Sequence, residues 1–458
     1  MTEDTVTPPS RPGRWPPLLA GAAALAILAP VSRAPWFWDD HVHLLLGREL
    51  PLDAAWRHGL LGVYFRPLGE AALWLVARLP GLTPFLSHLP AALAAALTAA
   101  LAAVLVLRAT DDGPAAAAAG LLAAVAPPSV AGAAWLANLP GALAGLLGIA
   151  SLAAVSRPCA AVLLALAAAA SKEDGILWLP AVFVLAAARR GTPRGRPAAA
   201  AVLAGVGTAA LLAWRQAVLG GPGGRLPVLP GGPLALAGLA AAAGAAVLVL
   251  RLVRPPMARA ALATALAGSV AAAALHPVVP PDPHGLRWRL LTVPVLAGSV
   301  AAGILLGTAR GAARTAGFAL AAAALAGSLA VSVRWERDWL HATAASGRLV
   351  RATVRALEAP GAPAGPVWID DPASEIALAA AVYRSAPELA ERSLPLRPLG
   401  ANLLVARHGV WREALPALWP ARLPGNPMRV DGWIAALMFP RPERLDAFPI
   451  LRPRGEEP

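Results

Sequence analysis

Two adjacent carboxylates, Asp39 and Asp40, follow the first apolar stretch of the chain in the run Trp36-Phe37-Trp38-Asp39-Asp40-His41-Val42-His43-Leu44. Aromatic rings favour the headgroup level of a bilayer, and ionisable residues beside a membrane often mark functional sites. A carboxylate in this place can serve as a general base or as a metal ligand. One of the two aspartates can instead cap a helix that begins near His41, and the dipeptide alone does not separate these interpretations.

A second charged segment, Ser171-Lys172-Glu173-Asp174-Gly175, lies between two apolar runs and contains the only lysine of the chain. An ionisable group at membrane depth costs about 2.5–3.5 kcal/mol on insertion scales, so these side chains need partners or a purpose. The alternative is a solvated turn in which the lysine and the carboxylates neutralise one another.

Other ionisable residues extend this set. Arg66 precedes Pro67, which we expect to end a helix, and its guanidinium can bind a lipid phosphate or snorkel to the surface. Arg287 and Arg289 precede a later apolar run. His41, His43 and His276 could join the aspartates as ligands of a divalent metal, although a His-x-His near acidic residues also arises by chance.

Composition places these residues in a polytopic membrane protein. Of the 458 residues, 57% are hydrophobic and only 14% are charged. The formal net charge is +13, but the arginines lie in short clusters between apolar runs. The positive-inside rule accounts for such clusters, so we expect no nucleic-acid partner. The single cysteine, Cys159, excludes an intrachain disulfide.

Apolar runs between charged or Pro/Gly-rich interruptions predict about eleven transmembrane helices. The first begins with basic residues like a signal peptide but lacks a small-x-small cleavage site, so we expect it to be retained. The predicted spans are 16–32, 84–107, 113–127, 137–156, 158–170, 175–188, 197–218, 232–253, 257–275, 289–308 and 313–332.

The loop charges predict a cytoplasmic N-terminus for residues 1–15, in a multi-pass protein of the cell membrane. Eleven arginines then fall in cytoplasmic loops: Arg108, Arg157, Arg189, Arg190, Arg194, Arg196, Arg251, Arg254, Arg259, Arg310 and Arg314. The short connections on the opposite side, which leave out the long loop 33–83, contain only five basic residues: Lys172, Arg215, Arg225, Arg287 and Arg289. This topology places the aspartate pair, the Ser171–Gly175 turn and the loop 276–289 on one extracytoplasmic face.

Two regions lie outside the predicted spans. The first extracytoplasmic loop, 33–83, is amphipathic and is expected to lie along the interface, within a transmembrane domain that covers 16–332. The tail, 333–458, is expected to be an extracytoplasmic α/β domain. It has a predicted helix over 334–357 and strands over 366–370 and 403–406. Asp370 and Asp371 precede a proline there and indicate a turn.

Taken together, the motifs resemble those of a family. They are the acidic pair with a nearby histidine, the Arg66-Pro67-Leu68 after an amphipathic stretch, the Ser-Lys-Glu before a short run ending in Leu179-Pro180, and Arg289 five residues before Pro294. In this order they resemble the polytopic glycosyltransferases of the GT-C fold, in particular the protein O-mannosyltransferase-like enzymes and bacterial relatives of the transmembrane tetratricopeptide mannosyltransferases. The resemblance covers roughly residues 30–300, and the tail shows no 34-residue repeat.

The resemblance implies transfer of a sugar from a polyprenyl-phosphate donor to an acceptor hydroxyl on the outer side of the membrane, with inversion. Asp39 would be the general base, and the adjacent Asp40 would raise its pKa. Negative charge develops on the leaving phosphate, so the site needs cationic side chains positioned beside the phosphate. Lys172 and Arg289 are the first candidates, with Arg287 and Arg66 in reserve. Glu173 would orient Lys172 or bind the acceptor, as His43 would. The motifs assign no cofactor, and a divalent metal stays an alternative. The acceptor can be a protein, a glycan or a lipid.

The chain also departs from the family pattern. Where relatives often have charged residues at the start of a middle span, this sequence reads Trp135-Leu136-Ala137-Asn138-Leu139-Pro140-Gly141, and the usual aromatic after Arg289 is Leu290. These departures leave open a member that binds without turnover. The alternative class is a transporter or lipid-binding membrane protein without chemistry, for which inverted repeats and charges within the spans are expected. No internal symmetry is evident in the sequence.

Overall fold

A computed structural model of the chain describes residues 13, 15–37, 39–49, 51–57, 65–179, 181–182, 195–219, 291–358, 367–369 and 451–453, which are almost entirely helical. The longer helices are α1 (Trp15–Leu28), α5 (Pro84–Thr110), α6 (Gly113–Val125), α8 (Leu139–Ala153), α9 (Pro158–Ser171), α11 (Gly195–Leu219), α14 (Thr292–Thr308) and α15 (Gly311–Glu358). The shorter elements are α2 (Asp39–Glu49), α3 (Leu52–Arg57), α4 (Pro67–Ala77), α7 (Pro127–Ala134) and the 3-10 helices η1 (Val31–Arg33), η2 (Leu136–Asn138) and η3 (Glu173–Leu177).

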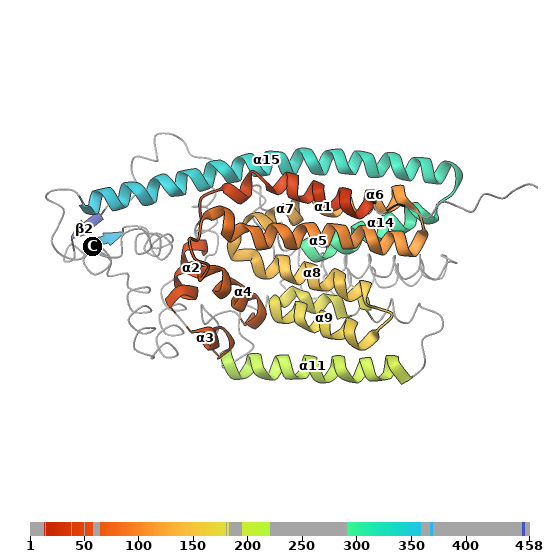
Figure 1. Cartoon of the computed structure of the whole chain (residues 1–458), viewed down its shortest axis with the longest axis horizontal. Coiled ribbons are helices and arrows are strands. Elements are labelled where there is room, and N and C mark those ends of the chain that lie inside the picture. Colours follow the sequence, from red (N-terminus) through yellow and green to blue (C-terminus); the bar gives the residue numbers. More distant parts are fainter. Residues whose placement is uncertain are drawn as a thin grey trace, which may run out of the picture.

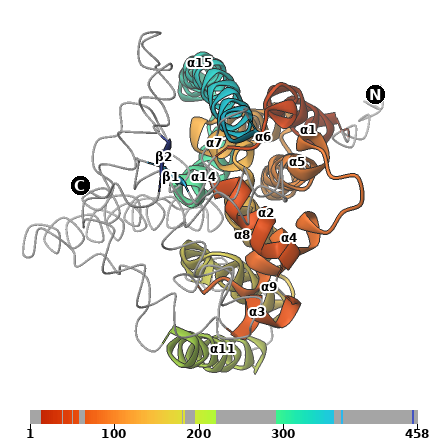
Figure 2. The ribbon, with the colours of Figure 1, turned by 90° about the vertical axis from the view of Figure 1, so that its left-hand side faces the viewer.

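The long helices lie side by side in one bundle, with α15 along one side and α11 along the opposite side (Figure 1). The short helices α2, α3 and α4 gather at one end of this bundle, which we call the α2–α4 end. Figure 2 looks onto that end and shows α2 and α4 near the ends of α8 and α9. Residues far apart in the sequence therefore meet there.

Four stretches of described helix are long and apolar enough to cross a membrane: Pro84–Thr110, Leu136–Ala153, Ala199–Val218 and Gly311–Ala344. Helices α6 and α7 meet the same criterion as a pair bent by 48°. Apolar helices of this length are typical of a helical membrane protein. The predicted spans 232–253 and 257–275, and half of 175–188, lie outside the described residues, so the total of eleven stays a prediction.

At the end of the bundle opposite the α2–α4 end, polar residues mark where one helix ends and the next begins. Asp111 ends α5 in the left-handed region at φ 52°. The side chain of Asp112 then caps α6 by accepting a hydrogen bond from the amide of Ala115 at 2.9 Å. Asp112 also pairs with Arg314 of α15 at 2.5 Å. These contacts fix α5, α6 and α15 to one another at this end.

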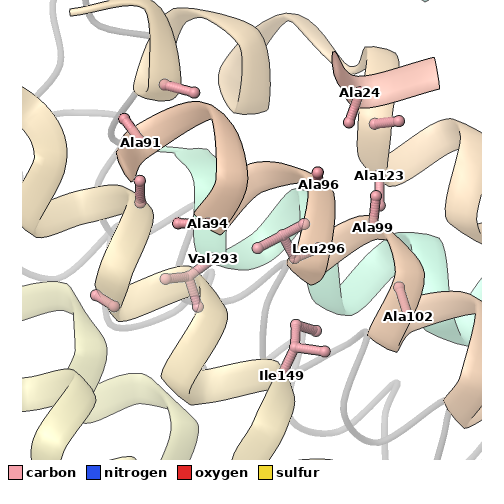
Figure 3. Close-up of a cluster of buried hydrophobic side chains, with 14 of the residues drawn as sticks. Ala24, Ala91, Ala94, Ala96, Ala99, Ala102, Ala123, Ile149, Val293 and Leu296 are labelled. Carbon is pink, nitrogen blue, oxygen red and sulfur yellow. The ribbon is translucent and has the colours of Figure 1, made fainter. Parts of the chain in front are cut away.

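The core between the helices consists largely of alanine, as the cluster around α5 and α14 illustrates (Figure 3). The helices approach closely because small residues face one another. A Cβ added at Gly120 would lie 2.5 Å from the Cβ of Ala20, and one added at Gly303 would lie 2.6 Å from the Cβ of Ala119. Close backbone packing therefore holds the bundle together where large side chains are few.

The described residues of the first loop, 33–83, form packed helices rather than a single helix on a membrane surface. The consecutive leucines 44–46 of α2 are all buried, and a Cβ at Gly47 would lie 2.8 Å from the Cβ of Ala77 in α4. Helix α3 fits the interfacial prediction better, because Trp56 is 45% exposed. The prediction for Pro67 was wrong: the residue begins α4, at a position where its missing N–H has no helical partner to lose.

Helix α15 continues without a break through the predicted domain boundary at 332/333, so the last predicted span and the predicted helix over 334–357 form one element. Ser332, near this boundary, donates a hydrogen bond to the carbonyl of Val125 in α6 at 2.7 Å. The predicted strand 366–370 is confirmed as β1 (Val367–Ile369), which pairs antiparallel with β2 (Leu451–Pro453) and places Trp368 opposite Arg452. Residues 370, 371 and 403–406 lie outside the described part.

Candidate active site

The aspartate loop and the Ser-Lys-Glu turn meet at the α2–α4 end of the bundle. Helix α4 packs so closely there that a Cβ at Gly69 would collide with the carbonyl oxygen of Ser171 and lie 2.5 Å from the Cβ of Pro140. Arg66, immediately before α4, pairs with Glu173, immediately after α9. Asp40 and Lys172 both contact η2, through the amide of Ala137 and the side chain of Asn138, so the two charged segments lie near this short helix. Their common extracytoplasmic face stays a prediction.

Aromatic packing positions the chain just before α2. Phe37 is fully buried, and its ring lies edge-on to Trp339 of α15 at 4.8 Å and to Trp135 at 6.1 Å. Trp339 in turn stacks on Trp335 at 5.2 Å. Such ring contacts add to the free energy gained by burial alone. They fix the start of α2 against α15 and the segment after α7.

Asp40 is fully buried, and both of its oxygens accept backbone hydrogen bonds. One accepts from the amide of Phe37 at 2.9 Å, and the other accepts from the amide of Ala137 at 2.8 Å. A carboxylate that accepts two backbone amides is held in place by both of them. Asp40 therefore ties α2 to η2. Helix α2 begins at Asp39, and both amides that Asp40 accepts lie outside α2, so these bonds are not the helix cap that the sequence left open for one aspartate.

Asp39, the predicted general base, is the first residue of α2. Its side chain lies outside the described part of the chain, so its role stays a prediction. Because Asp40 is held by Phe37 and Ala137, the backbone at Asp39 is fixed at the α2–α4 end.

Lys172 is buried, with only 5% of its surface exposed. Its ammonium lies 3.3 Å from a carboxylate oxygen of Asp174 and donates to the amide oxygen of Asn138 at 3.3 Å. The amide nitrogen of Asn138 donates in turn to the carbonyl of Gly132 at 2.8 Å. Asp174 and Asn138 thus orient Lys172, a role that the sequence analysis assigned to Glu173. Lys172 and Asp174 neutralise each other within the turn, as the alternative expected, but the burial of Lys172 shows that the lysine is not solvated.

Glu173 instead interacts with the guanidinium groups of Arg66 and Arg215. Its carboxylate accepts from the Nε of Arg66 at 2.8 Å and lies 4.0 Å from an Nη of Arg215 in α11. Arg215 was counted only as a loop charge in the sequence, because no local motif surrounds it. Its position shows that α11 also contributes to this end of the bundle.

His43 is buried within α2, and its Nδ1 has no hydrogen-bond partner among the described residues. Burial, and secondly the positive charge of Arg66, lower the pKa of His43 to about 4. The imidazole is therefore neutral at neutral pH and could hydrogen-bond a substrate hydroxyl. His41 lies edge-on to Trp36, with the ring centres 6.3 Å apart.

The third predicted segment is described only from its end. Arg287, Arg289 and His276 lie outside the described residues. Helix α14 begins at Thr292, whose hydroxyl donates to the carbonyl of Pro128 at 3.2 Å. A Cβ at Gly132 would lie 3.3 Å from that hydroxyl and 3.4 Å from the amide nitrogen of Asn138. The start of α14 thus borders the Lys172 site.

The described part of the chain contains no group of three or more His, Cys, Asp or Glu side chains placed to bind one metal ion. Comparison of the whole chain with family models, with curated proteins and with solved structures gives no match. What the described residues define is a helical membrane protein with a partly buried, ion-paired cluster at one end of its bundle. The chemistry of that cluster must be argued from its own residues.

Proposed function

We propose that this protein is an integral-membrane glycosyltransferase that moves a sugar from a polyprenyl-phosphate donor to an acceptor hydroxyl on the extracytoplasmic side. The observation that supports the proposal most is the buried ammonium of Lys172, held by Asp174 and Asn138 beside the Arg66–Glu173 ion pair. Fixed cations at the edge of an apolar bundle suit a leaving group that is a lipid-borne phosphate, because negative charge develops there in the transition state.

The proposed reaction is a single displacement. The acceptor oxygen bonds to the anomeric carbon, its proton passes to the carboxylate of Asp39, and the bond from that carbon to the phosphate oxygen breaks. The bonding electrons leave with the polyprenyl phosphate, whose charge Lys172 and Arg66 stabilise together with Arg289 and Arg287 of the loop before α14. Asp40 contributes by holding α2 in place, since its oxygens already accept two amides. His43 would bind the acceptor.

The proposal includes the membrane arrangement. The chain crosses the cell membrane about eleven times in a GT-C-like arrangement, with residues 1–15 in the cytoplasm and an extracytoplasmic α/β domain over 333–458. The gathering of Arg66, Lys172 and Glu173 at one end of the bundle is compatible with a reaction at one membrane face. A transport route would instead place ionisable groups along the middle of the spans.

The test uses the purified full-length protein with a panel of polyprenyl-phosphate sugars and acceptor hydroxyl compounds, and it measures free polyprenyl phosphate. Loss of a general base lowers a rate by about 10²–10⁴-fold, so we expect a loss of that size for Asp39→Asn. Asp111→Asn is the matched control, because Asp111 is exposed at the opposite end of the bundle. Release unaffected by Asp39→Asn would remove Asp39 from its role. Absence of release with every donor would favour a transporter or lipid-binding protein without chemistry.

A further inference from the structure

Helix α15 carries three buried polar groups that the proposed mechanism does not use. The Oε1 of Glu336 and the indole nitrogens of Trp335 and Trp339 are buried, and none of them has a hydrogen-bond partner among the described residues. Buried carboxyl and indole groups usually have a partner, because an unsatisfied polar group destabilises the fold. Three such groups within five consecutive residues point to a role outside the stability of the fold.

The three side chains lie on the side of α15 that faces the bundle. Glu336 follows Ser332 by four residues and precedes Trp339 by three, and residues at this spacing share one face of a helix. Ser332 donates to the carbonyl of Val125, and the ring of Trp339 contacts Phe37. Glu336 is accordingly only 6% exposed, and none of the described ion pairs includes it. Its carboxyl group is therefore held inside the bundle without a protein partner in the described part of the chain.

Aromatic rings surround this part of α15 and connect it to the start of α2. Trp335 stacks on Trp339 at 5.2 Å. The ring of Trp339 lies 5.6 Å from that of Trp135 and 4.8 Å from that of Phe37. Asp39 follows Phe37 by two residues, so their Cα atoms are at most about 7.6 Å apart. A group bound at these rings would lie beside the segment that carries the proposed general base.

The unsatisfied groups identify the chemistry of a ligand. A carboxylate only accepts hydrogen bonds, and an indole only donates them. An ammonium ion could donate to the carboxylate but would leave both indoles unsatisfied, and an anion would be repelled by the carboxylate. A hydroxyl group both donates and accepts. Neighbouring hydroxyl groups on a sugar ring can therefore satisfy all three, and the C–H faces of such a ring suit aromatic surroundings.

We propose that Glu336, Trp335 and Trp339 bind the hydroxyl groups of a carbohydrate acceptor. Glu336 accepts a hydrogen bond from one hydroxyl, and the two indoles donate to hydroxyl oxygens, so together they orient the acceptor beside α2. This inference rests on the proposed function and deepens it, because it selects a glycan among the acceptor classes that the sequence left open. Glu336 binds the acceptor and takes part in no covalent step.

A binding role and a structural role predict opposite effects of Glu336→Met on stability. Methionine has a similar length but no carboxyl group. Because the buried oxygen has no partner among the described residues, its removal should leave the unfolding midpoint of the ligand-free protein unchanged or raise it. The measurement is unfolding of the full-length protein by a denaturing detergent. A midpoint below that of the wild type would show a structural role and overturn the proposal.

Binding is measured by isothermal titration calorimetry on the full-length protein in nanodiscs, with methyl glycosides of neutral mono- and disaccharides as probes. Loss of a hydrogen bond to a charged acceptor predicts about 10- to 100-fold weaker binding by Glu336→Met. Glu336→Gln keeps an accepting oxygen, so we expect a smaller loss. Asp338→Asn changes a half-buried carboxylate two residues away on α15, and this matched control should bind like the wild type.

Equal saccharide affinity of Glu336→Met and Asp338→Asn would overturn the proposal, and it is the result expected if Glu336 holds only a buried water molecule. Failure of the wild type to bind any saccharide of the panel would overturn it as well. An acetylated peptide with a single serine hydroxyl should bind weakly. Equally strong binding of that peptide would overturn the carbohydrate assignment.

This experiment is separable from the proposed function, because it needs no lipid-linked donor. Saccharide binding that depends on Glu336 would stand even if no sugar were ever transferred. Conversely, sugar transfer to protein or lipid hydroxyls alone would refute the carbohydrate acceptor and leave the transferase proposal in place.

Discussion

Asp40→Ala would leave two backbone amides without an acceptor in a fully buried place. Asp40 accepts from Phe37 at 2.9 Å and from Ala137 at 2.8 Å, and Ala137 is 97 positions along the chain. A stranded buried donor costs about 1–3 kcal/mol, so the two together predict a loss of about 2–6 kcal/mol in the free energy of unfolding. Asp40→Asn keeps one accepting oxygen but sets an NH2 donor against the other backbone amide, so its loss should lie between half and the whole of the Asp40→Ala loss.

The measurement is unfolding of the detergent-solubilised full-length protein by a denaturing detergent, followed by intrinsic tryptophan fluorescence. Asp111→Asn is the control, because asparagine tolerates the left-handed backbone of that exposed position. The expected order of stability is Asp111→Asn equal to wild type, then Asp40→Asn, then Asp40→Ala. If Asp40→Ala unfolds at the same detergent fraction as Asp111→Asn, Asp40 does not join α2 to η2 and the structural interpretation of this carboxylate fails.

Three further predictions concern the same end of the bundle. Gly69→Ala should destabilise the protein by about 1–3 kcal/mol in the same assay, because the new Cβ would collide with the carbonyl of Ser171, and an unchanged midpoint would contradict that close approach. Lys172→Met should cost at most about 3–5 kcal/mol, because it leaves the partly buried carboxylate of Asp174 without its ion pair. Lys172→Met combined with Asp174→Asn should recover part of the loss in a double-mutant cycle. The pKa of His43 is about 4 in the folded protein, below its ordinary 6.5, so on acidification the unfolded state binds the proton first. The free energy of unfolding should therefore fall by about 3 kcal/mol between pH 7 and pH 4. His43→Phe should lack this part of the pH dependence, and a pH profile equal to that of the wild type would refute the burial of a neutral His43.

The helices that the sequence predicted well are those with strong local signals. Thr83 caps α5 by accepting a hydrogen bond from the amide of Leu86 at 3.2 Å, and Asp112 caps α6. Polar capping residues therefore lie where the apolar runs predict that these helices begin. The local pattern misled at Pro67, because a proline can end one helix or begin the next, and only the packing of α4 decides between them.

The candidate site was predictable in its charged motifs but not in its pairings. The sequence placed Lys172, Glu173 and Arg66 on one side of the predicted membrane, and in the structure Arg66 contacts Glu173. It could not reveal that Asn138 orients Lys172 or that Arg215 reaches Glu173, because neither residue belongs to a local motif. Such pairings depend on how helices far apart in sequence pack, and sequence periodicity does not encode that information.

The same limit applies to the two aspartates. As adjacent residues they look equivalent in sequence, yet a residue after α7 supplies the amide that fixes Asp40. Position along a helix, and not residue type, thus separates a structural carboxylate from a catalytic candidate. The two aspartates should therefore respond differently to mutation. Asp40 variants should lower the free energy of unfolding, whereas Asp39→Asn should lower turnover without lowering stability.

The most direct test of the account as a whole is the stereochemistry and stoichiometry of the reaction of the full-length wild-type protein with a polyprenyl-phosphate sugar. A single displacement at the α2–α4 end predicts one polyprenyl phosphate released for each sugar transferred, with the anomeric configuration of the product inverted relative to the donor. A product with retained configuration, or no release from any donor offered in a membrane, would contradict it.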